Sequence, residues 1–131
     1  MQMDDQYHTT PVAIIVEDDP FWMKTIIAAL ADEDVEILQA GSAKKGLELL
    51  AQNRSAILIV DIILPDMDGL EFMKAAQKLV KGVPVMAISA GGRLGADFYL
   101  RLASGFGALE TLKKPFTRDR FLQRWRRLVT S

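Results

Sequence analysis

The strongest constraint on the fold is an alternation of short apolar runs with stretches whose apolar residues recur at helical spacing. Each run has the length of a single buried strand and is bounded by charges, glycine or proline. The predicted strands are residues 12–16, 35–40, 57–60, 83–89 and 108–112. A helical pattern follows each of them, so the 131 residues predict an α/β fold with a parallel sheet covered by helices on both faces.

Polar residues and one proline mark where the helices are expected to begin, because side-chain oxygens at these places cap free backbone N–H groups. These residues are Asp19 with Pro20, Ser42, Asp68 and Thr117. The apolar faces of the predicted helices are expected to enter the core. The fourth helix contributes Leu94, Phe98 and Leu102, and the last contributes Phe121, Leu122, Trp125, Leu128 and Val129.

Polar side chains stand at the ends of four of the predicted strands. Glu17 and Asp18 follow the first strand, Asp61 follows the third, Ser89 closes the fourth, and Lys114 lies just past the fifth. The carboxyl ends of parallel strands meet at one edge of a sheet, which is where such folds bind ligands. Three acids, a hydroxyl and an ammonium at one edge indicate a site for a divalent cation and a phosphoryl group.

Composition indicates one domain, which we assign to residues 11–131, preceded by a polar, flexible tail of residues 1–10. The absence of cysteine excludes disulfides and thiolate metal sites. No apolar run approaches the roughly 20 residues that span a bilayer, and the N-terminus is not a signal peptide. A cytoplasmic protein that does not contact membranes is expected.

The net charge of −1 conceals an asymmetry between the two halves of the chain. Residues 1–61 hold eleven acids and four bases, whereas residues 62–131 hold six acids and twelve bases, including five arginines within 118–127. Without an overall basic excess, a nucleic-acid-binding domain is not indicated. The arginines suit either a dimer or partner surface, or a solvated basic helix.

These residues resemble the receiver domains of two-component response regulators. The matching segments are 16–19 with the letters V-E-D-D, 61–69 with D-I-I-L-P-D-M-D-G, Ser89-Ala90 and Lys114-Pro115. These segments occur in order, and the resemblance covers nearly the whole chain, from Val12 to Val129. The resemblance implies the flavodoxin-like (βα)5 fold with strand order 2-1-3-4-5.

The resemblance also implies roles for three side chains. Asp61 would be the phosphoacceptor, taking a phosphoryl group from a histidine kinase, a histidine phosphotransfer protein or a small phosphodonor. Lys114 would contact a phosphoryl oxygen as a point charge, and the Ser89 hydroxyl would donate to another. Lys113 is expected on the opposite face of the strand, by alternation.

Mg²⁺ is the implied cofactor, since an anionic carboxylate attacks an anionic phosphoryl group and charge must be neutralised. Asp18 and Asp61 would be direct ligands, Glu17 would act through water, and the backbone carbonyl of Ile63 would complete the protein ligands.

Several positions depart from the pattern of the family. Thr111 stands where an aromatic residue is usual, Ser89 replaces the commoner threonine, and the segment 89–114 is longer than usual with glycines near its start. The positions that tune dephosphorylation are Ile63 and Gly91. Because the apolar Ile63 would hinder an attacking water, we expect a long-lived phosphorylated form.

Three functions are compared. The first is a signalling module that acts by binding an unidentified output protein, and a homodimer is one possible form of it. This module is not an enzyme, apart from catalysing its own phosphorylation and dephosphorylation. The second is a degenerate receiver that binds partners without phosphorylation. The third is a haloacid-dehalogenase-like phosphatase, suggested by Asp66-Met67-Asp68-Gly69 but disfavoured by Pro65 and Leu70. Met1 and the complete set of elements favour a separate receiver.

Overall fold

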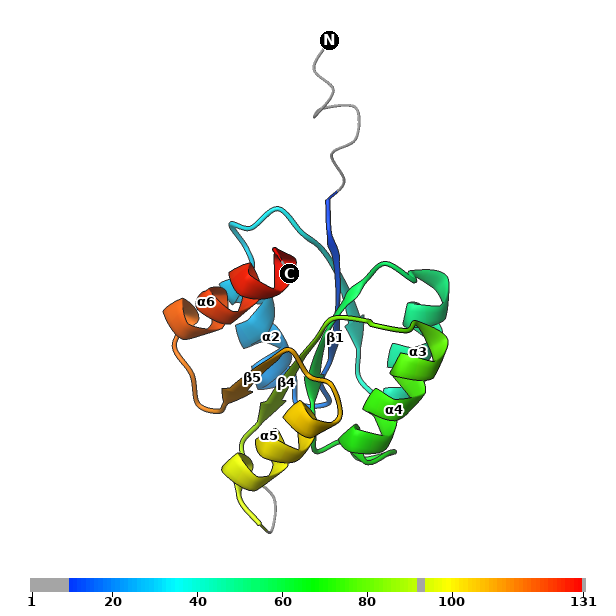
Figure 1. Ribbon diagram of the computed structural model, residues 1–131. Helices are drawn as coiled ribbons and strands as arrows, with labels where there is room; N and C mark the ends of the chain where they lie inside the picture. The colour runs from blue at the N-terminus through cyan, green and yellow to red at the C-terminus, as the bar shows by residue number, and fades with distance from the viewer. Residues whose placement is uncertain (1–9, 92–93, 131) are drawn as a thin grey trace.

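A five-stranded parallel sheet forms the centre of the protein in the computed structural model, which describes residues 10–91 and 94–130 (Figure 1). The strand order is β2-β1-β3-β4-β5, which confirms the predicted flavodoxin-like topology, with β2 at an edge as expected. The strands are β1 Val12–Val16, β2 Glu36–Ala40, β3 Ile57–Asp61, β4 Val85–Ser89 and β5 Glu110–Lys113.

The helices begin where their capping residues predicted. Side-chain oxygens of four caps accept hydrogen bonds from backbone N–H groups of the first helical turn, and the caps are Asp19, Ser42, Asp68 and Thr117. The helices are α2 Pro20–Ala29, α3 Ala43–Gln52, α4 Gly69–Leu79, α5 Ala96–Gly105 and α6 Arg118–Val129.

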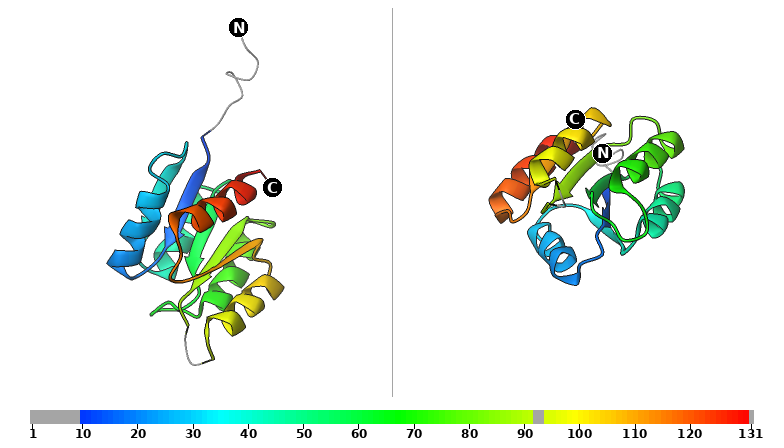
Figure 2. Two further views of the ribbon diagram at one scale, coloured as in Figure 1. Left: turned by 90° about the vertical axis from the view of Figure 1, so that its left-hand side faces the viewer. Right: turned by 90° about the horizontal axis from the view of Figure 1, so that it is seen from below.

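The helices lie in two layers, one on each face of the sheet (Figures 1 and 2). Alternate strand residues point to opposite faces, so each layer has its own core. On one face, Ile15 and Ile59 pack with α2 and α6, and on the other, Ile14 and Leu58 pack with α3, α4 and α5. Buried strands of this kind read as continuous apolar runs, as the sequence did.

Strand register brings the predicted polar positions to one edge of the sheet. Val16 of β1 is level with Val60 of β3, so Glu17 and Asp61 follow neighbouring strands at the same height. Asp61 is level with Ile88, and Ser89 is level with Lys113. The strand pairing therefore places residues distant in sequence beside one another.

The expected apolar face of α5 was wrong. Leu94 precedes the helix and is 63% exposed, and Phe98 and Leu102 are only partly buried. The helix instead buries Ala96, Leu100 and Ala103 against the sheet. Two of these three are alanines, which carry little hydrophobic signal in the sequence.

Smaller corrections concern element ends. Val129 lies on α6 but is 40% exposed, unlike the other predicted members of its face, which are buried. The strands predicted at 35–40, 83–89 and 108–112 begin one or two residues later, because the first residues of each run belong to the preceding connection. Differences of one or two residues are usual at the ends of helices and strands.

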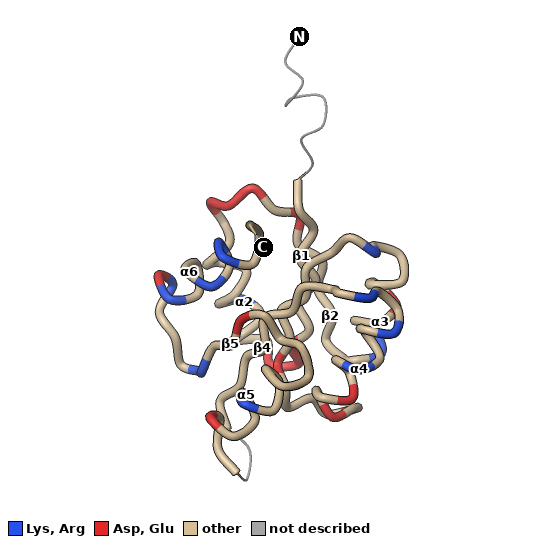
Figure 3. The backbone as a smooth tube through the Cα atoms, in the orientation of Figure 1, with Lys and Arg blue, Asp and Glu red and all other residues tan. Residues whose placement is uncertain are grey.

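Basic residues of α6 lie near acidic residues of the connection between α2 and β2 (Figure 3) and form ion pairs with two of them. Arg118 pairs with Asp32 at 3.0 Å, and Arg126 pairs with Glu33 at 3.2 Å, both across to the connection between α2 and β2. Arg127 also pairs with Glu110 of β5, at 2.6 Å. The charge asymmetry between the halves is therefore partly balanced within the molecule.

The predicted N-terminal tail, apart from Thr10, falls outside the described residues. Thr10 itself donates a hydrogen bond to Asp34 at 3.2 Å. None of the helices in the described part of the chain has the length and apolar character needed to cross a membrane.

Candidate functional site

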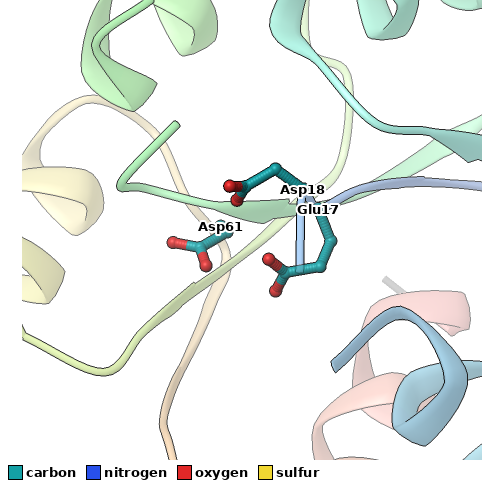
Figure 4. A group of neighbouring side chains, drawn as sticks. All are labelled: Glu17, Asp18 and Asp61. Atoms are coloured by element: carbon teal, nitrogen blue, oxygen red, sulfur yellow. The ribbon is translucent and has the colours of Figure 1, made fainter. Parts of the chain in front are cut away.

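Three carboxylates converge at the carboxyl edge of the sheet (Figure 4). Glu17 and Asp18 come from the end of β1, and Asp61 is the last residue of β3. One oxygen from each lies within 4.8 Å of the others. Glu17 and Asp61 are buried, whereas Asp18 is exposed, so the cluster is open to solvent on the side of Asp18.

Lys114 bridges two of these carboxylates. Its Nζ donates to Glu17 Oε1 at 2.6 Å and to Asp61 Oδ2 at 2.7 Å. The Lys114 side chain is 4% exposed. Lys113 points away, is 60% exposed and pairs with Asp97, as the alternation along the strand predicted.

Burial and charge shift the protonation of this group. Burial raises the pKa of Glu17 to about 7, with the nearby charge of Asp61 adding to the effect against the hydrogen bond from Lys114. Burial would lower the pKa of Lys114, but the hydrogen bonds and charges of Asp61 and Glu17 outweigh it and raise that pKa above its ordinary value. Lys114 therefore stays an ammonium.

The loop after β3 is fixed by short-range contacts around Asp61. The backbone N–H of Ile63 donates to Asp61 Oδ1 at 2.8 Å, which orients the carboxylate. Gly69 begins α4 and donates to the carbonyl of Ile62 at 3.0 Å. A Cβ on Gly69 would lie 2.3 Å from that carbonyl oxygen, so only glycine fits here.

Ser89 is completely buried at the end of β4. Its hydroxyl accepts from the N–H of Gly91 at 3.2 Å and donates to the Gly91 carbonyl at 3.4 Å. The hydroxyl is therefore held by the loop after β4, and donation to another group would require it to leave the Gly91 carbonyl.

Thr111, which replaces the aromatic residue usual in the resembled family, lines an open cavity of about 640 Å³ between α5, β5 and α6. Arg101, Arg120 and Arg124 line the same cavity. The sequence did not predict it, because a cavity arises from the spacing of three elements and not from a motif.

Sequence reasoning also missed two contributors. The ring of Trp22, in the first turn of α2, lies 5.0 Å from Lys114 Nζ. Asp66 accepts hydrogen bonds from the backbone N–H groups of Ala43 and Lys44, which ties the loop after β3 to the start of α3. Neither has a local signal, since each partner is remote in the sequence.

Asp66 and Asp68 are both occupied at helix N-termini, at α3 and α4 respectively. The cluster of three carboxylates identified among the described residues contains neither of them. The arrangement therefore gives no support to the phosphatase alternative that rested on these two acids.

The donor set fits Mg²⁺, which prefers carboxylate and carbonyl oxygens. Three carboxylates at this spacing repel one another, and burial together with the neighbouring charge of Asp61 raises the pKa of Glu17. A cation among them would relieve the repulsion. The open side at Asp18 gives such an ion access from solvent.

Comparison with known proteins gives the family. A model of the response regulator receiver domain matches residues 13–126. The chain belongs to this family. Acceptance of a phosphoryl group is the general role of receiver domains, and such domains serve two-component signalling systems.

Two curated bacterial relatives are longer proteins. The transcriptional regulatory protein GlrR of Escherichia coli K12 is 28% identical over 88% of this chain and 26% of its own length. A protein-glutamate methylesterase/protein-glutamine glutaminase of Agrobacterium fabrum is 34% identical over 81% of this chain and 30% of its own length. The receiver therefore spans about a quarter to a third of these two relatives. A 14.6 kDa protein of Leptolyngbya boryana is 34% identical over 78% of this chain and 77% of its own.

Solved structures agree on the fold. A response regulator receiver domain protein from Clostridium thermocellum superposes with a TM-score of 0.82 at 22% identity, covering 92% of this chain and 94% of that one. A receiver domain protein from Methanospirillum hungatei gives 0.79 at 25% identity, covering 93% and 96%. A beryllofluoride-activated NtrC4 receiver domain dimer gives 0.80 at 23%, covering 89% and 94%.

Proposed function

We propose that this receiver domain accepts a phosphoryl group on Asp61, with Mg²⁺, and signals by binding other proteins. The observation that carries the proposal is the position of the Asp61 carboxylate. It lies at the carboxyl end of β3, 2.7 Å from the Lys114 ammonium and beside the carboxylates of Glu17 and Asp18. A nucleophile, a fixed cation and metal ligands thus stand together.

The reaction requires a carboxylate nucleophile and compensation of negative charge. An Asp61 oxygen forms a new bond to phosphorus while the bond between phosphorus and the donor breaks, and the donor leaves with its electron pair. The product is an acyl phosphate on Asp61. Lys114, which already contacts Asp61 Oδ2, stabilises the charge on a phosphoryl oxygen, and the Ser89 hydroxyl donates to another.

Glu17, Asp18, Asp61 and the backbone carbonyl of Ile63 are the groups that would hold Mg²⁺. When bound, the ion neutralises charge on the phosphoryl oxygens and on the attacking carboxylate. The Ile63 N–H holds Asp61 Oδ1 in place, which leaves the carboxylate oriented before the donor arrives.

The family supports the kind of partner. A histidine kinase or histidine phosphotransfer protein would supply the phosphoryl group in the cytoplasm, and an output protein would bind the phosphorylated state. The transcriptional regulator and the methylesterase among the relatives are longer proteins, of which the match covers 26% and 30%. The receiver dimer among the similar structures supports a homodimer as one form of output.

Intact-mass measurement tests the proposal. The protein is incubated with acetyl phosphate or phosphoramidate, with Mg²⁺ or with a chelator. We expect a single phosphoryl addition that needs Mg²⁺ and is absent in Asp61→Asn. The matched control is Asp68→Asn, because Asp68 caps α4 and lies outside the carboxylate cluster. This variant should still gain one phosphoryl group. Equal addition to Asp61→Asn would refute the proposal.

A further inference from the structure

Two carboxylates and one aromatic ring lie close to the ammonium of Lys114. Besides Glu17 and Asp61, its Nζ lies 5.0 Å from the centroid of the Trp22 ring. An ammonium within about 6 Å of an indole face is attracted by the ring quadrupole, and tryptophan is the strongest partner for this interaction. The Lys114 side chain is 4% exposed, so little water screens the attraction.

The ring is itself held by other aromatic side chains. Trp22 lies 5.1 Å from the ring of Phe116, and Phe116 stacks on Phe121 at 5.7 Å. Phe21 meets the Trp22 ring edge-on at 5.2 Å. Phe121 is completely buried in the core between the sheet and α6. Trp22 is therefore supported from the core side through Phe116, which stacks on the buried Phe121.

The local sequence explains why the ring reaches this place. Asp19 caps α2 and Pro20 begins it, so Trp22 falls in the first turn, directly after the strand that delivers Glu17 and Asp18. Lys114 and Phe116 flank Pro115 just past β5. Both the lysine and the ring that supports Trp22 thus come from the same connection.

We propose that Trp22 is a positioning residue that holds the Lys114 ammonium at the phosphoacceptor. The inference rests on the proposed function of Asp61. A lysine side chain has a flexible four-carbon stem, so a fixed attractive surface reduces the conformational freedom that must be lost when the ammonium contacts a phosphoryl oxygen. Trp22 touches neither the donor nor the transferred group, and it acts through Lys114.

The test separates the charge attraction from simple packing. The protein is produced with tryptophan replaced by mono-, di- or trifluorinated tryptophan, because fluorine weakens the negative ring face with little change in size. The rate of phosphorylation by acetyl phosphate at saturating Mg²⁺ is followed by intact mass. We expect the rate to fall stepwise with fluorine number, to about one fifth at full loss of the attraction.

Two substitutions accompany the series. Trp22→Leu should phosphorylate about fivefold more slowly, and Trp22→Phe should recover much of the rate because an aromatic face returns. The sequence contains two tryptophans, the second being the buried Trp125. Trp22→Phe produced with fluorinated tryptophan carries fluorine only at Trp125, so its rate should not change with fluorine number.

The outcomes are distinct. A graded fall in the wild type together with a flat control series supports the positioning role. A phosphorylation rate that does not change with the number of fluorine atoms overturns the positioning role of Trp22, while the proposed function of Asp61 stands. Absence of any phosphoryl addition in the unfluorinated wild type refutes the proposed function and this inference with it. If Trp22→Leu fails to fold, the fluorinated wild type still decides the question.

Discussion

Replacement of Lys114 by methionine is the sharpest test of the electrostatics of the site. Methionine keeps the length and apolar stem of the side chain but removes the ammonium, which lies 2.6 Å from Glu17 and 2.7 Å from Asp61. The two carboxylate side chains are 1% and 9% exposed, so water cannot replace the lost charge. Removing one partner of a buried ion pair costs about 3–5 kcal/mol.

Glu17 moderates that cost, since its pKa of about 7 lets it take up a proton near neutral pH. We therefore expect Lys114→Met to lower the free energy of unfolding by about 3 kcal/mol without Mg²⁺. Mg²⁺ should stabilise the variant more than the wild type, because it supplies positive charge to the same carboxylates. An ion at one hundred times its Kd would return about 2.7 kcal/mol.

Urea denaturation followed by far-ultraviolet circular dichroism measures these free energies without relying on the fluorescence of nearby Trp22. Lys113→Met is the matched control, since Lys113 is 60% exposed and its ion pair with Asp97 is 3.7 Å long. Its effect should stay within about 0.5 kcal/mol. A Lys114→Met protein as stable as the wild type in the absence of Mg²⁺ would refute the reasoning.

Three further results are expected. Gly69→Ala should lower the free energy of unfolding, measured in urea, by about 1–3 kcal/mol, because the new Cβ would lie 2.3 Å from the backbone oxygen of Ile62. Gly41→Ala is the control, since a Cβ there has open space around it. Equal effects of the two substitutions would contradict this reasoning. Asp66→Ala should lower the free energy of unfolding at neutral pH, because the charged Asp66 carboxylate, whose pKa is lowered by the backbone N–H groups of Ala43 and Lys44, stabilises the folded state. The difference in stability between the variant and the wild type should shrink below about pH 3.8, where the carboxylate takes up a proton. A difference that does not depend on pH would argue against the cap. The phosphorylated form should persist for minutes or longer, because Ile63 offers no polar group to orient a water, and a half-life of seconds in a mass time course would oppose that view.

The sequence was informative where a short local pattern indicates a single kind of structure. The run 57–60 followed by Asp61 predicted both a buried strand and an acid at its end, because apolar continuity is typical of strands buried on both faces. Polar capping residues such as Ser42 likewise predicted where the helices begin. These local signals predicted a parallel sheet with helices on both faces, and the strand order 2-1-3-4-5, which the structure confirms, came from the resemblance to receiver domains.

The remainder depended on contacts between distant segments. The buried face of α5 was missed because Ala96 and Ala103 carry little hydrophobic signal, whereas Leu94 and Phe98 carry a strong one. The contact between Trp22 and Lys114 joins the first turn of α2 to the connection after β5, and no spacing in the sequence predicts it. Such pairings follow from packing, which a single sequence does not display.

Three neighbouring carboxylates leave one central question, namely which of them carries the phosphoryl group. Reduction of the phosphorylated protein with borohydride converts an aspartyl phosphate to homoserine, which peptide sequencing by mass spectrometry then locates. The proposed geometry predicts homoserine at position 61 alone, since Asp61 is oriented by both the Ile63 N–H and Lys114. Homoserine at position 18, or a reduced acid at position 17, would contradict the assignment of Asp61 as the phosphoacceptor.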